Sequence, residues 1–482
     1  MGIALLLAML HATLATSGVA PGATSYLLRY DGPPSQVVHV TITPARPVAG
    51  PATLVIPRAI PMGYANEPYD RYVAGVRGTT SGGRGLSARR DEGPRWSVGT
   101  RGDSVRSIFY DVDIGAMERA ITDASAASKL RDGYAGLLGY TVFGYVDGLE
   151  DRPVVLRVEG PEGWPVFSTL APRVPAAVGA LAAEAPDFYG LADGQVLMGP
   201  DLRVRRAPAA IPLYVAVYAE ATVDLDVISR LSAEAMDRAV AYFGGAPMQH
   251  YTVVQEYLEP VSPLHEYGFS MEHMESGTFF LGVDRSVTAT TGRDVLDRTR
   301  FNFIHHFSHS WIPKRAYGRG YFPFTWELAP LIETIWVSEG FIRFATIEMD
   351  AERRGGAEGA AYRARTLEGY RAYLAGLPAF LRGMSLIDLS RVGSTQYGSD
   401  FRVGKSLFMR GALMAGEMDA RIRSRTQGRK GMRDALRGLI SWTRAHPRGF
   451  EVAELPGIIR EATGVDVSDI YARWLTPPAE GG

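Results

Sequence analysis

The sequence contains no cysteine, and it carries no strong excess of either charge. The absence of cysteine excludes disulfide bonds and thiolate ligands, so any metal ion must be held by His, Asp or Glu side chains. The 51 basic residues balance 52 acidic ones, so nothing in the overall charge predicts a nucleic-acid partner. Beyond the N-terminus no apolar run is long enough to span a bilayer, and we expect no transmembrane segment there.

Residues 1–20 have the features of a secretory signal peptide. The apolar stretch from Ile3 to Leu10 is followed by small residues that end in Ser17-Gly18-Val19-Ala20. We therefore expect an exported protein, either periplasmic or secreted. No Lys or Arg precedes the apolar stretch and Pro21 follows the expected cleavage point, so a disordered or anchoring N-terminus is the alternative.

Short runs with strand periodicity recur between turn residues from residue 24 to residue 175. This pattern, in a chain with 54 Gly and 30 Pro, predicts an N-terminal antiparallel β-domain over residues 24–175. The expected strands are Tyr26 to Tyr30, Val37 to Ile42, Ala52 to Ile56, Ser107 to Val112, Tyr140 to Tyr145 and Val154 to Val158. The Ala- and Pro-rich stretch from Pro172 to Pro212 predicts a linker or an irregular crossover.

The remaining chain is predicted to be richer in helix. A strand at Leu213 to Tyr218 and a helix at Val227 to Phe243 open a second domain, expected over residues 210–345. A C-terminal helical domain is expected over residues 346–476, with long helices at Glu358 to Leu374, Val403 to Ile422 and Met432 to Arg444. The fold class expected is therefore α+β with several domains.

The chemistry of the chain is concentrated between His265 and Glu339, a span that holds five of the nine histidines. His309 follows His305 by four positions, which places both residues on one face of a helix. Glu339 follows in an aromatic segment. Two imidazoles and a carboxylate are a common zinc ligand set that leaves one coordination position open. A single histidine is more often a packing residue, but this spacing favours a metal site.

The segments Phe303 to Arg315 and Trp336 to Phe341 resemble the glycyl aminopeptidase family of zinc metallopeptidases, gluzincins with a thermolysin-like α/β catalytic domain. In that family an H-E-x-x-H helix continues into W-x-x-K-R, here Trp311 to Arg315, and an S-E-G-F segment follows. The resemblance implies one Zn²⁺ ion held by His305, His309 and Glu339. It also implies release of small N-terminal residues such as Gly or Ala from peptides.

Three further segments extend the resemblance over most of the chain. Gly268 to Ser276 is similar to the family's G-G-x-E-H-x-x-S strand, which implies that Glu272 grips the free amino terminus of a peptide. Ile56 to Tyr64 and Gly160 to Trp164 are similar to family turns, so the β-domain is expected to belong to the same architecture. Arg315 is expected to line the substrate cleft or to satisfy carbonyl groups at a helix end. No PDZ domain is expected.

Two positions depart from the family pattern. His306 stands where the family has the glutamate that acts as general base, and an imidazole beside a metal cation is a poor proton acceptor. Phe408 stands where the relatives have a tyrosine that stabilises the oxyanion. Tyr397 either replaces that hydroxyl, if its loop reaches the metal, or is an exposed turn residue.

Three interpretations follow from the sequence. The favoured one is a zinc-binding, catalytically impaired metallopeptidase-like protein whose cleft still captures peptide amino termini. The second is an active zinc aminopeptidase that uses His306, Tyr397 or Glu275 in altered roles. The third is a metal-free scaffold that binds a partner. The orientation of His306 is left open, because it could face the metal, turn away, or replace one of the two histidine ligands.

Overall fold

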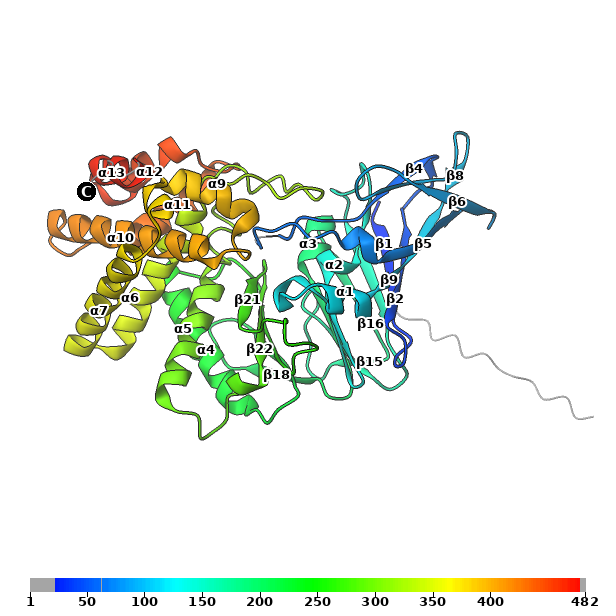
Figure 1. Cartoon of the computed structure of the whole chain (residues 1–482), viewed down its shortest axis with the longest axis horizontal. Coiled ribbons are helices and arrows are strands. Elements are labelled where there is room, and N and C mark those ends of the chain that lie inside the picture. Colours follow the sequence, from blue (N-terminus) through cyan, green and yellow to red (C-terminus); the bar gives the residue numbers. More distant parts are fainter. Residues whose placement is uncertain (1–21, 62, 477–482) are drawn as a thin grey trace, which may run out of the picture.

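The computed structural model describes residues 22–61 and 63–476, so the expected signal peptide at residues 1–20 lies outside the described residues. Three regions follow one another along the longest axis of the molecule (Figure 1). A β-rich region lies at one end, a mixed sheet with two long helices lies in the middle, and a helical region lies at the other end. The fold is α+β with several domains, as the sequence predicts.

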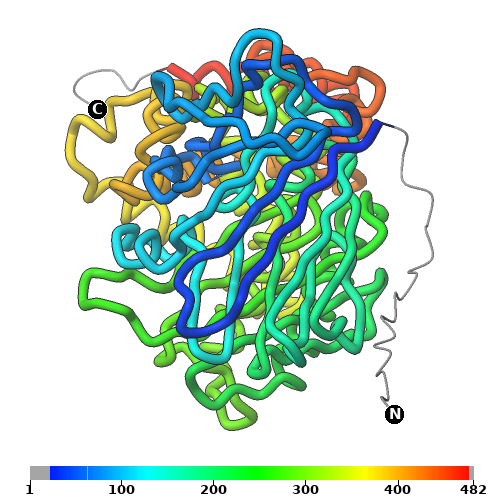
Figure 2. The backbone as a smooth tube through the Cα atoms, turned by 90° about the vertical axis from the view of Figure 1, so that its right-hand side faces the viewer, coloured from blue at the N-terminus to red at the C-terminus, as the bar shows by residue number. Residues whose placement is uncertain are grey.

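The N-terminal region is built on a strongly curved half-barrel sheet. Its strand order is β12-β4-β7-β6-β5-β9-β2-β1-β13-β16. Strands β1 and β2 are antiparallel, with alternate residues buried, and the blue strands of Figure 2 show this long hairpin along the outside of the sheet. The strands are β1 (Thr24–Arg29), β2 (Val37–Thr43), β4 (Ala52–Val55), β5 (Val73–Thr79), β6 (Gly85–Arg90), β7 (Arg95–Val98), β9 (Ser107–Asp113), β12 (Tyr145–Val146), β13 (Val154–Glu159) and β16 (Ala180–Ala185), with the small pair β3 (Val48–Ala49) and β8 (Ser104–Val105) beside them.

A second sheet and three short helices close the concave side of the half-barrel. The sheet has the order β10-β11-β17-β14-β15. Its strands are β10 (Lys129–Arg131), β11 (Tyr134–Leu138), β17 (Gln195–Met198), β14 (Pro165–Ser168) and β15 (Ala177–Val178), and the helices are α1 (Ile114–Ala120), α2 (Gly139–Val142) and α3 (Phe188–Asp193).

Two local predictions are wrong in this region. The run Tyr140 to Tyr145 is not one strand but helix α2 followed by strand β12, because a short apolar run that is buried on all sides has no periodicity to separate helix from strand. The stretch Pro172 to Pro212 is not a linker, since it contains β15, β16, α3, β17 and β18 (Arg203–Ala207). In β16 the buried residues alternate with exposed ones, but small alanines on the buried face give a weak sequence signal.

The central sheet has the order β18-β19-β20-β22-β21. Its inner strands β19 (Leu213–Ala219), β20 (Tyr251–Leu258) and β22 (Ser276–Gly282) are parallel, and β18 (Arg203–Ala207) and β21 (Phe269–Glu272) are antiparallel edges. Helices α4 (Leu225–Phe243) and α5 (Arg293–Ser308) pack on one face. The other face contacts the β-rich region through the stacked rings of Tyr134 and Tyr218.

The C-terminal region consists of helices packed around α10 (Phe401–Arg425). The long helices that the sequence predicts are present, with ends that differ by a few residues. They are α6 (Ile342–Arg354), α7 (Gly356–Ala375), α8 (Ala379–Gly383), α9 (Leu386–Gln396), α11 (Met432–Ala445), α12 (Leu455–Thr463) and α13 (Ser468–Leu475). One continuous core joins these helices to the central sheet, and none of the described helices is long and apolar enough to cross a membrane.

Candidate metal centre

Helix α5 brings three histidines to its C-terminal end. Phe303, Ile304 and Phe307 are fully buried against the central sheet and fix the rotation of the helix. That rotation turns His305 and His309 into the interior, where both are buried. His309 is the residue that ends the helix, and its backbone N–H still bonds to the carbonyl oxygen of His306. The two imidazoles therefore lie on a rigid element rather than on a loop.

Glu339 reaches the same point from the π-helix η4 (Trp336–Phe341). This wide turn packs against α10 where two glycines meet, and a Cβ atom on Gly340 would lie 2.4 Å from the Cα atom of Gly411. No side chain larger than hydrogen fits at this crossing. A π-helical turn inside a helix often marks a functional site. Here it places the Glu339 carboxylate opposite the two histidines.

The donor atoms of His305, His309 and Glu339 have the spacing of a tetrahedral zinc site. The two Nε2 atoms are 3.3 Å apart, and the Oε2 atom of Glu339 lies 3.5 Å from the first and 3.7 Å from the second. Atoms bound about 2.0–2.2 Å from a tetrahedral zinc ion lie about 3.3–3.6 Å from one another. These three residues could hold a Zn²⁺ ion with only a small adjustment of the side chains.

The surroundings of His309 also fit a metal ligand. Its Nδ1 atom lies 3.1 Å from the carbonyl oxygen of Ile312, to which it donates a hydrogen bond. This bond leaves Nε2 without a proton and directed toward His305 and Glu339. A backbone carbonyl on the second ring nitrogen is a common way to fix the tautomer and the orientation of a metal-bound histidine.

The electrostatics of the site favour a bound cation. Burial, together with the neighbouring histidines, lowers the pKa of His305 well below its usual value, and burial lowers the pKa of His309. Burial and the nearby charge of Glu272 raise the pKa of Glu339 well above its usual value. The raised pKa favours the protonated form of Glu339, and a divalent ion held between Glu339 and the histidines would favour the carboxylate instead.

Glu272 is the last residue of β21 and faces His306. The Oε2 atom of Glu272 lies 3.4 Å from Nδ1 of His306. Burial alone would raise the pKa of Glu272, but the imidazoles of His309 and His306 lower it to about 2. His306 therefore lies beside Glu272, the carboxylate expected to receive a peptide amino terminus. It does not join the set of His305, His309 and Glu339, and it does not turn to solvent.

A cleft of about 320 Å³ opens in front of these residues. Tyr397 lines it and packs on Phe408 and Tyr64, so it is not an exposed turn residue, and it lies close enough to Glu339 for that carboxyl group to help raise the pKa of the tyrosine. Phe408 faces His305 edge-on. The cleft is lined by Gly63, Tyr64, Asp123, Ser125, Gly268, Phe269, Ser270, Met271, Glu272, Asn302, His305, His306, Glu339, Arg343, Tyr397, Gly398, Phe401, Lys405, Phe408 and Met409.

Sequence reasoning missed two groups in this cleft. Tyr64 ends the segment Ile56 to Tyr64, whose resemblance to a family turn gives it no role in the site, and its hydroxyl hydrogen-bonds to Tyr321 (3.0 Å) and Ser338 (3.3 Å) behind Glu339. The side chain of Asp123 comes from the β-rich region, where no local pattern marks it. The Pro-Met-Gly-Tyr turn could have indicated Tyr64, whereas only the fold could bring Asp123 to the site.

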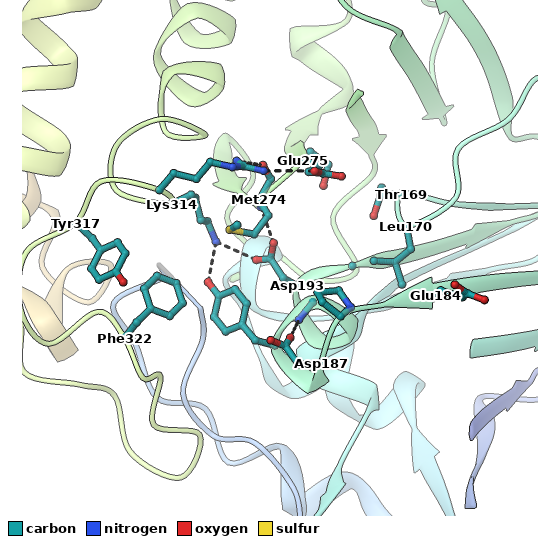
Figure 3. Close-up of a pocket in the computed structure, with 16 residues that line it drawn as sticks. Thr169, Leu170, Glu184, Asp187, Asp193, Met274, Glu275, Lys314, Tyr317 and Phe322 are labelled. Carbon is teal, nitrogen blue, oxygen red and sulfur yellow. Dashed lines mark hydrogen bonds and ion pairs between the residues drawn. The ribbon is translucent and has the colours of Figure 1, made fainter. Parts of the chain in front are cut away.

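Arg315 lies in a different pocket, of about 430 Å³, between the β-rich region and the central region. Figure 3 shows it, with Glu275 and Lys314 on one side and Asp187 and Glu184 on the other. One terminal nitrogen of Arg315 donates to the carbonyl oxygens of Met274 (2.9 Å) and Ser310 (3.0 Å), and the other lies 3.3 Å from Glu275. It lines neither the cleft nor the metal centre.

A buried ion pair in the same pocket connects the two regions. Lys314 Nζ lies 2.9 Å from Oδ1 of Asp193 at the end of α3, and it also donates to the Tyr189 hydroxyl (Figure 3). Asp193 further accepts from Nδ1 of His273 (3.3 Å) and from the backbone N–H of Met274 (2.6 Å). Since these residues directly follow Glu272, Asp193 holds the end of the strand that carries it.

The other histidines in the described part of the chain have structural partners. His265 bonds to the carbonyl oxygen of Glu118, and His250 lies 3.4 Å from Glu275. His39 pairs with Asp111, and His446 stacks on Trp442. Of the five histidines between positions 265 and 339, only those on α5 contribute to possible metal sites in the described part of the chain.

Comparisons with known proteins agree with a metallopeptidase fold. A family model described as Peptidase M61 N-terminal domain matches residues 25–200. The structure is similar to an aminopeptidase N family protein from Idiomarina loihiensis, with a TM-score of 0.80 and 18% identity over 94% of this chain and 76% of that one. No curated protein sequence matches the chain.

Two structures of an M1 zinc metallopeptidase from Deinococcus radiodurans are also similar. One has a TM-score of 0.56 and 16% identity over 96% of this chain and 94% of that one. The other is a mutant bound to a Tyr-Ser-Ala substrate, with a TM-score of 0.54 and 16% identity over 94% and 93% of the two chains. At these identities the likeness shows the fold, and the side chains of this chain must carry any functional argument.

Proposed function

We propose that the protein is a zinc-binding member of the glycyl aminopeptidase family whose cleft captures peptide amino termini and whose hydrolytic step is impaired. One observation carries the proposal. The ligand set of His305, His309 and Glu339 has tetrahedral zinc spacing, while the neighbouring position that should hold a carboxylate base holds His306. The metal site is retained and the proton acceptor beside it has changed.

The metal and the protein would divide the chemistry between them. A bound zinc ion would supply Lewis acidity toward water and toward a peptide carbonyl group. The protein must then accept a proton, and a neutral imidazole next to a dication is poorly suited to this because proton uptake creates a second cation. Loss of a general base slows a reaction by about 10²- to 10⁴-fold.

Glu272 is the group proposed to receive the amino terminus. It is buried and its lowered pKa keeps it ionised at neutral pH, which suits it to bind an ammonium group. Nδ1 of His306 already lies 3.4 Å from this carboxylate. A peptide amino terminus must therefore displace His306 or share Glu272 with it. His306 thus interferes with binding of the amino terminus as well as removing the general base.

An active aminopeptidase is the alternative that one observation favours. Tyr397 lines the same cleft as Glu339, so a tyrosine hydroxyl is present near the metal centre despite Phe408. Glu275 gives no such support, because it pairs with Arg315 and lines the neighbouring pocket instead. A metal-free scaffold is the third candidate, and the converging donor atoms of His305, His309 and Glu339 argue against it.

The test compares zinc-loaded wild type with His306→Glu on glycyl and alanyl amide substrates. We expect little turnover by wild type and a gain of at least about 10²-fold in the variant. His306→Gln is the matched control, because it removes the imidazole without adding a carboxylate and should stay slow. Wild-type turnover that a chelator abolishes would refute impairment, and wild type that binds no zinc would refute the metal site.

A further inference from the structure

A second group of metal-binding side chains overlaps the first. Donor atoms of Glu272, His306 and His309 all lie within 4.8 Å of one another, as do those of His305, His309 and Glu339. We propose that Glu272, His306 and His309 form an alternative ligand set, so that one metal ion can be held in either of two positions that share His309.

The geometry of the second set comes from two elements. His306 and His309 are three residues apart at the end of α5, which places their rings on adjacent sides of the helix, 5.9 Å apart between centroids. Strand β21 supplies Glu272 from the opposite wall. The 3.4 Å between Oε2 of Glu272 and Nδ1 of His306 matches one edge of a tetrahedral site, about 3.3–3.6 Å.

An unpartnered nitrogen points to an ion at this position. The Nδ1 atom of His306 is buried but has no hydrogen-bond partner, because the Glu272 carboxylate lies at 3.4 Å with unfavourable geometry. A buried polar atom without a partner is costly, and most are satisfied by protein, water or an ion. A cation between Glu272 and His306 would satisfy both groups at once.

The two positions cannot both be filled. Nδ1 of His309 donates to the carbonyl oxygen of Ile312, so only Nε2 is free to bind a metal. A single nitrogen binds one ion, and the chain should therefore hold one ion that exchanges between the two sets. The second set is looser, because the rings of His306 and His309 are 5.9 Å apart between centroids whereas those of His305 and His309 are 4.6 Å apart, and its affinity should be the weaker.

The second position also bears on peptide capture, a consequence that depends on the proposed function. A metal ion on Glu272 neutralises the carboxylate that would receive an ammonium group. Occupation of the second set and capture of a peptide amino terminus through Glu272 should therefore exclude each other. A peptide with a free amino terminus would drive the ion to His305 and Glu339, whereas an N-acetylated peptide would not.

The first experiment measures zinc content and affinity of the full chain by dialysis and chelator competition. Wild type should bind one ion. Glu339→Gln should still bind one ion, weakened about 10- to 100-fold, because Glu272 and His306 remain. The double variant Glu339→Gln/His306→Gln should lose zinc, and His309→Gln alone should lose it as well. His306→Gln alone should keep one ion.

A second measurement reports the position of the ion directly. The absorption spectrum of bound Co²⁺ depends on its ligands, so Glu339→Gln and His306→Gln should give different spectra if each retains a different set. The inference is overturned if Glu339→Gln loses zinc entirely while circular dichroism shows it folded, or if adding His306→Gln to it changes nothing. Wild type without zinc would refute the proposed function too, whereas those two results refute the second set alone.

Discussion

The buried carboxylate of Asp193 should be essential for the packing of the β-rich region against the metal-binding region. We consider Asp193→Asn, which keeps the size of the side chain and removes its charge. In the wild type the side chain of Asp193 is 3% exposed and that of its partner Lys314 is fully buried. Solvent screening is therefore small, and the variant leaves an uncompensated ammonium group in the interior.

Removal of one partner from a buried ion pair costs about 3–5 kcal/mol. Asp193 also accepts bonds from His273 and from the backbone of Met274, so the cost should lie toward the upper end of this range. Lys314→Met is the matched control that removes the opposite charge. The double variant should lose less stability than the sum of the two single variants, because it leaves no unpaired charge.

The assay is urea unfolding followed by tryptophan fluorescence, with the free energy of unfolding taken from linear extrapolation. Burial by itself would raise the pKa of Asp193, but Lys314 and His273 lower it well below its usual value of 3.8. A lowered folded-state pKa gives stability that is present above pH 3.8 and lost as the pH falls. The difference between wild type and Asp193→Asn should therefore shrink in acid. An unchanged midpoint at pH 7, or additive single effects, would refute this account.

Three further outcomes are expected. Zinc at about 100 times its dissociation constant should stabilise wild type by about 2.7 kcal/mol in thermal unfolding, and His309→Gln should not respond. Tyr397→Phe should weaken zinc binding about 10- to 100-fold in chelator competition, because a hydroxyl group beside the Glu339 ligand is lost; equal affinity would show that Tyr397 does not support this ligand. Gly411→Ala should lower stability by about 1–3 kcal/mol, because its Cβ would lie 2.4 Å from the Trp336 carbonyl oxygen, whereas Gly369→Ala, with open space around it, should not.

The sequence predicts the helical region well because its signals are local. The helix expected at Val403 to Ile422 exists as α10 with a few added residues, and the alternating runs of the β-rich region exist as strands β1, β2, β9 and β13. Local signals fail where burial is complete or the side chains are small. Tyr140 to Tyr145 and the alanine-rich β16 are the examples, since neither has a contrast between an apolar and a polar face.

The residues of the candidate site also fall into those that a local sequence pattern predicts and those that only the tertiary fold brings together. The spacing of His305 and His309 on one helix is a local pattern, and the structure brings both to Glu339. The partner of His306 could not be inferred, because Glu272 comes from a strand 34 positions earlier whose distance to the helix depends on the whole central sheet. Asp193 and Asp123 lie in the β-rich region, so no pattern around the histidines could indicate them.

The walls of the cleft come from parts of the chain that are far apart. Tyr64 lies near the start, Glu272 and His306 lie in the middle, and Lys405 and Phe408 lie near the end. A fragment that keeps only the histidine helix and Glu339 would keep the ligands but lose Glu272, Tyr64 and Phe408 from the walls of the cleft. A change at either end of the chain should therefore alter what the middle can bind.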